Sequence, residues 1–342
     1  MKINPNKKSI LILFGIVVLI LIINSSTNMF NIFKKTDSQR IALGLEIFSE
    51  SEYSNFIKLV ESDLTSRGIE VGGVKDGYLT AKVDGNEQSF GLVNLAQNCK
   101  LVAQTEWSSV IKEHFDALAR SKGDEEEINK NLTDFNKIKN LLAIQLYPDD
   151  YLNAAGELKK EVITRSNIPT VNNTLVLDLP ASIRPVKKSE AKVWNKTEDE
   201  LFAVALNNTF NKIKPEIIEQ QMQGGKVTFI TSDNFLTAVL VLNLKKFNQC
   251  MGTHGSLVAI PTRGVIMCYP INDLGVVKAI SGFAPFVTKL HSEGPGSLSP
   301  KLYWYQDDKF TDLPYKIENG KLNFAPPQNF LDTLNKLEEP KS

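Results

Sequence analysis

The stretch from Ile69 to Val93, IEVGGVKDGYLTAKVDGNEQSFGLV, decides the fold class of the first half of this chain. It contains three short runs rich in β-branched, aromatic and alternating apolar residues. Two Asp-Gly pairs, at 76–77 and 84–85, separate the runs. Such runs are typical of strands, and Asp-Gly is a dipeptide that tight hairpins favour. We therefore predict a three-stranded meander made of residues 69–74, 78–83 and 88–93.

Two helical patterns flank this meander. Apolar residues recur at helical spacing from residue 47 to Leu64, ahead of Gly68, and again from Trp107 to Leu118. This spacing predicts two helices that each bury one face. Residues 36–122 are therefore expected to form an α+β module with the order helix, meander, helix.

A connecting segment, 123–167, is expected between this module and the next. Gly123 is expected to break the chain, and Asp124 with Glu127 has the spacing of a capping box. Apolar residues at helical spacing from Ile128 to Leu142 then predict a helix that ends at Tyr147-Pro148.

The remaining residues, 168–342, predict a second α+β module in which helices pack on a mixed sheet. Thr197 and Glu200 form a capping box ahead of a helix that Pro215 stops, and residues 235–244 predict a very apolar helix. Asn319-Gly320 indicates a hairpin within 315–324. The strands are expected at 174–179, 227–231, 256–260 and 265–269.

The N-terminus, residues 1–35, contains fourteen consecutive apolar residues from Ile10 to Ile23. Adding the polar ends gives a helix that spans a membrane, which needs about 20 residues. Lys2, Lys7 and Lys8 precede the run, so the positive-inside rule keeps the N-terminus in the cytoplasm and places the body outside. We predict a single-pass anchor. The alternative is a cleaved signal peptide and a secreted or periplasmic body.

Charge and motifs exclude several classes of function. The chain has 39 basic and 39 acidic residues, so it lacks the electrostatic footprint of a nucleic-acid-binding protein. The sequence contains no phosphate-binding glycine loop and no signature of a catalytic nucleophile or zinc protease. No cofactor and no catalytic residue are predicted.

Only a weak metal site can be drawn. Cys250, His254 and Cys268 carry ligand atoms, with His291 as a fourth, but their spacing matches no standard zinc pattern. If the body is outside the cytoplasm, a disulfide between Cys250 and Cys268, with Cys99 buried, is an open alternative. His254 also remains a candidate binding residue.

Arg184 and Arg263 are the best candidates for binding a partner or a ligand carboxylate. Only six of the basic residues are Arg, and each of these two lies beside or near a proline that fixes the backbone. The alternative is that each guanidinium braces its own loop. Trp304, within an aromatic strand at 303–305, is expected on a contact surface because successive side chains in a strand face opposite ways.

Several stretches resemble the YtpQ-like family of bacterial proteins of unknown function. They are residues 89–95, 176–186, 198–208, 231–238 and 257–263. The resemblance covers most of residues 47–270 and supports the two-module organisation, but names no reaction. The N-terminal anchor and the tail after about residue 290 depart from the family pattern.

These observations together predict a membrane-anchored bacterial protein with a non-enzymatic binding function. Its partner is expected to be a protein or an envelope component, and its oligomeric state is open. The rival prediction is a hydrolase-type or metal-dependent enzyme centred on residues 250–268 that uses His254 and Arg263.

Overall fold

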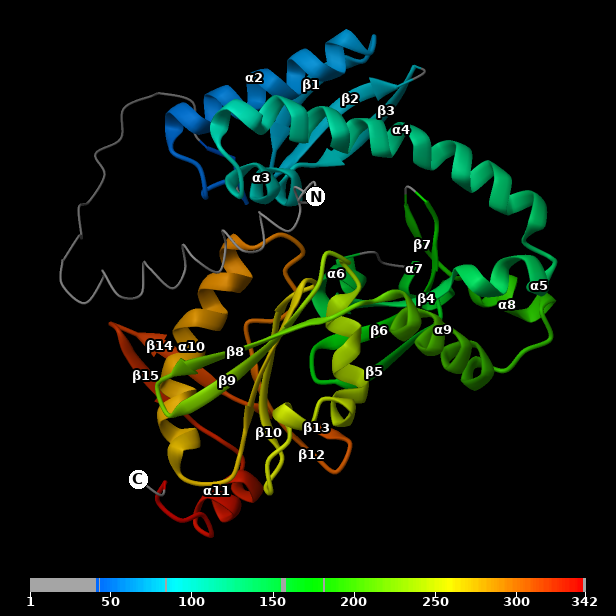
Figure 1. Cartoon of the computed structure of the whole chain (residues 1–342). Coiled ribbons are helices and arrows are strands. Elements are labelled where there is room, and N and C mark those ends of the chain that lie inside the picture. Colours follow the sequence, from blue (N-terminus) through cyan, green and yellow to red (C-terminus); the bar gives the residue numbers. More distant parts are fainter. Residues whose placement is uncertain (1–40, 43, 84, 155–157, 181, 341–342) are drawn as a thin grey trace, which may run out of the picture. The chain divides into compact units, whose positions relative to one another are not determined.

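The computed structural model describes residues 41–340 except 43, 84, 155–157 and 181 (Figure 1). The fold is a mixed α+β fold, and contacts divide it into two compact units with the boundary between Ala119 and Arg120. The predicted anchor at residues 10–23 lies outside the described residues. Among the helices that are described, none is long and apolar enough to cross a membrane.

The meander of the first unit is confirmed. Strands β1 (Glu70–Lys75), β2 (Tyr78–Val83) and β3 (Asn86–Gly91) pair antiparallel in that order. Asp76 and Gly77 have φ values of 51° and 75°. Positive φ at both central residues is the geometry of the type I′ turn, which matches the twist of a hairpin.

The helices of the first unit cover one face of this meander. Leu79 and Ala81 of β2 are buried against a core that includes Phe56 and Trp107, whose rings meet edge to face at 6.4 Å. The helices are α2 (Glu50–Ser66), α3 (Val93–Lys100), the 3₁₀ turn η1 (Gln104–Glu106) and α4 (Trp107–Asn131).

The predicted break at Gly123 is wrong, because α4 continues through it to Asn131. One glycine lowers the stability of a helix by about 1 kcal/mol. Ile128, which lies in the part of α4 that belongs to the second unit, offsets this loss by burying its side chain in that unit's core. The predicted helix through Leu142 is also wrong. After the short α5 (Phe135–Ile138), residues 142–148 form a strand.

The first sheet of the second unit has strand β6 at its centre. β6 pairs antiparallel with β4 on one side and with β5 and β7 on the other. Nearly all of β4 is buried on both faces, which explains why its apolar run was mistaken for a helix. The strands are β4 (Leu142–Pro148), β5 (Thr164–Ile168), β6 (Val171–Asp178) and β7 (Ile183–Pro185).

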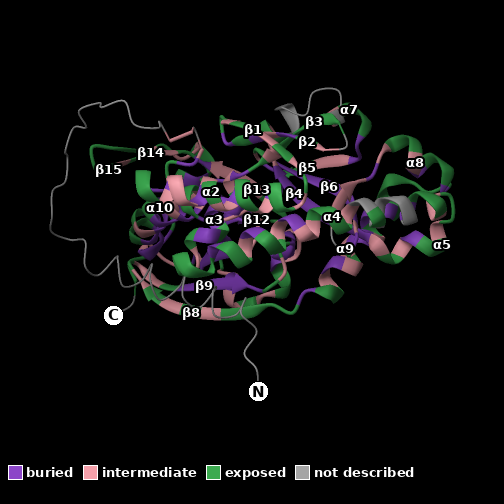
Figure 2. Cartoon of the chain, turned by 90° about the horizontal axis from the view of Figure 1, so that it is seen from above, coloured by how far each residue is buried: buried purple, intermediate pink, exposed green. Residues whose placement is uncertain are grey.

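The second sheet has six strands in the order β13-β12-β10-β11-β9-β8, and all of its pairings are antiparallel, so the predicted mixed sheet is wrong. β9 is mostly buried, whereas β8 at the edge is mostly exposed (Figure 2). The strands are β8 (Glu216–Met222), β9 (Gly225–Thr231), β10 (Ser256–Thr262), β11 (Val265–Pro270), β12 (Leu302–Gln306) and β13 (Lys309–Leu313). The predicted hairpin at 315–324 is confirmed as β14 (Tyr315–Glu318) and β15 (Lys321–Phe324).

Helices cover the sheets of the second unit. α9 (Glu198–Lys212) packs on β4 and begins at the predicted capping box, in which the Thr197 hydroxyl accepts from the Glu200 N–H. α10 (Gly275–Glu293) packs on β9 and β10 and was not predicted. The others are η2 (Lys139–Leu141), α6 (Asp149–Ala154), α7 (Leu158–Glu161), α8 (Lys188–Val193), η3 (Thr237–Lys246), η4 (Asn248–Cys250) and α11 (Gln328–Leu334).

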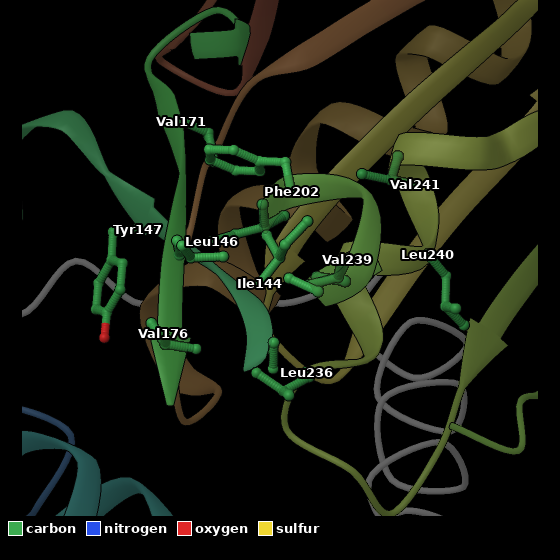
Figure 3. Close-up of a cluster of buried hydrophobic side chains, with 14 of the residues drawn as sticks. Ile144, Leu146, Tyr147, Val171, Val176, Phe202, Leu236, Val239, Leu240 and Val241 are labelled. Carbon is green, nitrogen blue, oxygen red and sulfur yellow. The ribbon is translucent and has the colours of Figure 1, made fainter. Parts of the chain in front are cut away.

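One core joins the two sheets of this unit. Figure 3 shows Ile144 and Leu146 of β4 directed toward Val239 of η3 and Phe202 of α9. The apolar segment predicted as an α-helix at 235–244 is instead the 3₁₀ segment η3, interrupted at Asn243. In the same view Tyr147 points away from this cluster, and this direction places it in the candidate site described next.

Candidate binding site around Arg263

The turn between β10 and β11 holds Arg263. Every residue of β10 is buried, so the strands that carry the turn are rigid. The Arg263 N–H donates to the Gly296 carbonyl at 2.9 Å, and the Arg263 carbonyl accepts from the Ala238 N–H at 2.9 Å. Neighbouring segments therefore hold the Arg263 backbone on both sides of the turn.

The Arg263 side chain is half-buried and lies over Tyr147, on which Tyr151 stacks. Its guanidinium carbon lies 5.1 Å from the centre of the Tyr147 ring, within the range of a cation–π contact. The Tyr147 and Tyr151 rings stack at 5.1 Å with 12° between their planes. Burial lowers the pKa of Arg263, and the two tyrosines partly oppose this.

The charge of Arg263 is not used by an internal ion pair. Within the part of the chain that the structure describes, no carboxylate forms a salt bridge with it, and its Nε–H is buried without an acceptor. Arginine residues that are this deeply placed are ordinarily paired, because desolvating a charge is costly. This guanidinium is therefore available to a group from outside the described fold.

Local sequence explains the placement of the two tyrosines. Tyr147 lies near the end of β4, and Tyr151 follows four residues later in α6 after the chain turns at Pro148. The Tyr147 hydroxyl donates to the Gln145 Oε1 at 2.7 Å, which fixes the ring. Tyr151 keeps 57% of its surface exposed and presents the outer ring of the stack.

A buried polar network supports the end of β4. Asn172 of β6 lies opposite Tyr147, and its amide nitrogen donates to Asp149 while its amide oxygen accepts from the Ser166 hydroxyl at 2.8 Å. Buried polar groups that are satisfied in this way rigidify a structure. The network therefore holds Asp149 and the start of α6 in a fixed position beside the stack.

His291 near the end of α10 belongs to the same neighbourhood. Burial lowers the pKa of His291, and the nearby Asp150 carboxylate acts in the opposite direction. The His291 carbonyl accepts from the Ser297 hydroxyl at 2.6 Å, next to the Gly296 carbonyl that holds Arg263.

Arg184 has a different environment. Its Nη1 donates to the Glu190 Oε1 at 2.7 Å, and the two side chains are only 17% and 14% exposed. Glu190 in turn accepts from the Lys187 N–H at 2.9 Å, so the pair ties β7 to the start of α8. The structure therefore supports the bracing alternative for Arg184.

His254 and Trp304 lie together at the other end of β10 from Arg263. A seven-residue strand separates the two ends by about 20 Å. The Trp304 Nε1–H donates to the His254 carbonyl at 2.9 Å, and its ring packs edge to face on Phe330. Trp304 is only 5% exposed, so it is not on the expected contact surface.

The two cysteines of the weak metal candidate are buried thiols. Cys250 and Cys268 are fully buried as free cysteines that contact each other, and burial raises the pKa of Cys268 well above its usual value. In the described ranges no group of three or more His, Cys, Asp or Glu side chains is arranged to hold a metal ion. His254 therefore does not complete a metal site with them.

Sequence reasoning missed Tyr147 and Tyr151, and it considered His291 only as a fourth metal ligand. The local signal for these two tyrosines was Pro148, which ends the apolar run at Tyr147 and turns the chain shortly before Tyr151. No local signal links either tyrosine to Arg263. Comparisons with protein-family models, with curated proteins and with solved structures give no match.

Proposed function

We propose that this chain is a membrane-anchored bacterial binding protein, without enzymatic activity, that recognises an anionic group of another molecule through Arg263. The observation that carries the proposal is that the Arg263 guanidinium lies over the Tyr147 ring without an ion-pair partner among the described residues, whereas the Arg184 guanidinium is paired with Glu190. Arg is suited to this role because its planar donors match carboxylate and phosphate oxygens.

The cellular placement is part of the same proposal. Residues 10–23 anchor the chain, the N-terminus is cytoplasmic and the body faces outward, with a cleaved signal peptide as the alternative. The resemblance to the YtpQ-like family also stays a proposal. Protease added to spheroplasts is expected to digest the body, and protection until the membrane is broken would overturn the outward orientation.

Arginine side-chain NMR tests the binding site directly. The chain has six Arg residues, so the Nε–H signals of the full-length protein in detergent are few enough to assign by single substitutions. We expect acetate or phosphate to shift the Arg263 signal while the Arg184 signal, which belongs to a paired guanidinium, stays in place. Equal shifts at all six arginines, or none at Arg263, would contradict the proposal.

A further inference from the structure

We propose that Cys250 and Cys268 form a disulfide bond in the cell, which cross-links the core of the second unit. The structure describes both residues as thiols, which is the reduced form. The inference goes beyond ligand binding and does not depend on Arg263. It rests on one part of the proposed function, the outward placement of the body, because disulfides form and persist outside the reducing cytoplasm.

Strand register places Cys268 on a defined face of the second sheet. Cys268 of β11 lies opposite Thr228 of β9 and opposite Val258 of β10. Directly opposed residues of an antiparallel pair share a face, so these three side chains point to the same side of the sheet. The Ser256 side chain points to that side too, because Ser256 lies two residues before Val258 in β10.

Two of these side chains hold the segment that carries Cys250 over the same face. The Thr228 hydroxyl donates to the Gln249 carbonyl at 3.5 Å, and the Ser256 hydroxyl donates to the Cys250 carbonyl. The 3₁₀ turn η4 therefore lies over Cys268, and the two thiols are in hydrogen-bonding contact. Both cysteines are fully buried in one core cluster, so the folded chain keeps them together.

The bond forms by exchange with an external disulfide, either a small one such as oxidised glutathione or a disulfide of another protein. One cysteine thiolate attacks this disulfide, forms a mixed disulfide and releases a first external thiol. The second cysteine thiolate attacks the mixed disulfide, closes the Cys250–Cys268 bond and releases a second external thiol. Two electrons pass to the external disulfide, and the two cysteine protons end on the released thiols.

Burial restricts this exchange to the time before the core closes. Both thiols are fully buried, and burial raises the pKa of the Cys268 thiol well above its ordinary value. The thiolate is the nucleophile, so a chain that has already folded in the reduced form reacts slowly. A bond that has formed is equally inaccessible to reductants. We therefore expect it to be reduced only after unfolding.

Cys99 provides an internal reference for the measurement. The chain has three cysteines, and Cys99 is the single one within the first unit. It is a buried thiol in α3, and burial raises its pKa to about 12. With no second cysteine in its own unit, it is expected to stay a thiol in the same cells that oxidise the other two.

The experiment maps the thiols of the full-length protein taken from intact cells. Cells are quenched with acid, the protein is unfolded in urea with N-ethylmaleimide, and its tryptic peptides are analysed by mass spectrometry. Trypsin cuts after Arg263, so Cys250 and Cys268 fall in separate peptides. We expect these two peptides to be joined until a reductant is added, whereas the Cys99 peptide carries N-ethylmaleimide from the start.

Two variants and a reduction assay sharpen the result. Cys99→Ala should leave the joined peptides unchanged, whereas Cys268→Ala should let N-ethylmaleimide label Cys250 without reduction. A phosphine reductant should leave the bond intact in the native protein and break it in urea. Reduction that is as fast in the native protein as in urea would overturn the shielding of the bond by the core.

The remaining outcomes overturn the disulfide itself. Labelling of all three wild-type cysteines without a reductant would show that the bond does not form. A bond from Cys99 to either of the other cysteines would show that the pairing is wrong. These results leave the anion-binding test at Arg263 untouched, and protease digestion of spheroplasts tests the outward placement separately.

Discussion

The β7 edge and the β10–β11 turn each present an arginine next to or near a proline, but the fold uses the two charges differently. Arg184 is paired with Glu190 only six residues along the chain. Arg263 is followed by apolar strand β11, and its guanidinium lies over the Tyr147 ring. Because the Glu190 carboxylate lies in the same loop as Arg184, the two form an ion pair that stabilises the loop. Arg263 has no such carboxylate nearby in the chain, so its charge stays available to another partner.

The largest expected effect is loss of stability in Arg184→Ala. The substitution leaves the Glu190 carboxylate in a mostly buried place without its cation, and breaking such pairs typically costs about 3 kcal/mol. Urea unfolding followed by circular dichroism measures the change. Lys226→Ala, which breaks an exposed pair with Glu219, is the control and should cost under about 0.5 kcal/mol. Similar values for the two variants would show that Arg184 is not a brace.

Removing both partners should be milder than removing one. In Arg184→Met with Glu190→Gln, no buried charge remains uncompensated, so the double variant should recover about 1 to 2 kcal/mol relative to Arg184→Ala. The same urea titrations of the single and double variants give the coupling energy. If the losses simply add, the two side chains do not depend on each other.

At the other turn, Arg263→Met should change the unfolding free energy by about 1 kcal/mol or less. Methionine retains an apolar stem against Tyr147, and what is lost is one cation–π contact. The same variant should abolish the binding of carboxylate probes. A decrease in unfolding free energy of several kcal/mol would instead show that Arg263, like Arg184, stabilises its own loop.

The smallest expected effect concerns His291 beside the Arg263 turn. Burial lowers the pKa of His291 in the folded state, so the unfolded chain takes up the proton more readily. The unfolding free energy should therefore fall as pH decreases through the unfolded value of about 6.5, and level off below the folded pKa.

The measurement is urea unfolding of wild type and His291→Gln at pH 7.5, 6.5 and 5.5. The variant should show a shallower decline. His114 in the first unit, whose pKa burial also lowers, contributes a decline of the same sign that remains in the variant. Identical pH profiles of the two proteins would exclude a titration of His291 in this range.

Local chemistry made parts of the fold predictable. The meander follows from alternation and from Asp76-Gly77, and α9 follows from the Thr197 cap. In both cases the residues that decide the structure are neighbours in the chain.

Helix α10 was not predicted, because Gly275, Gly282 and Pro285 all disfavour helix formation. Its apolar face nevertheless packs on β9 and β10. Gly275 is needed there because the chain approaches Gly224 too closely for a Cβ.

The candidate site was predictable only in part. The scarcity of Arg and the fixed backbone near Pro261 pointed to Arg263 from sequence alone. The hydrogen bonds to Gly296 and Ala238 that hold its backbone were not predicted. Those contacts come from distant parts of the chain, and nothing in the residues next to Arg263 encodes them.

The sequence by itself determined the short-range elements of this protein: its turns, its capped helices and the strands that adjacent hairpins join. Only the tertiary structure decided that Leu142–Pro148 is a strand, that Arg184 pairs with Glu190, and that Arg263 lies over Tyr147. The physical reason is that periodicity and turn preferences act over a few residues, whereas burial and charge pairing depend on which surfaces the whole fold brings together.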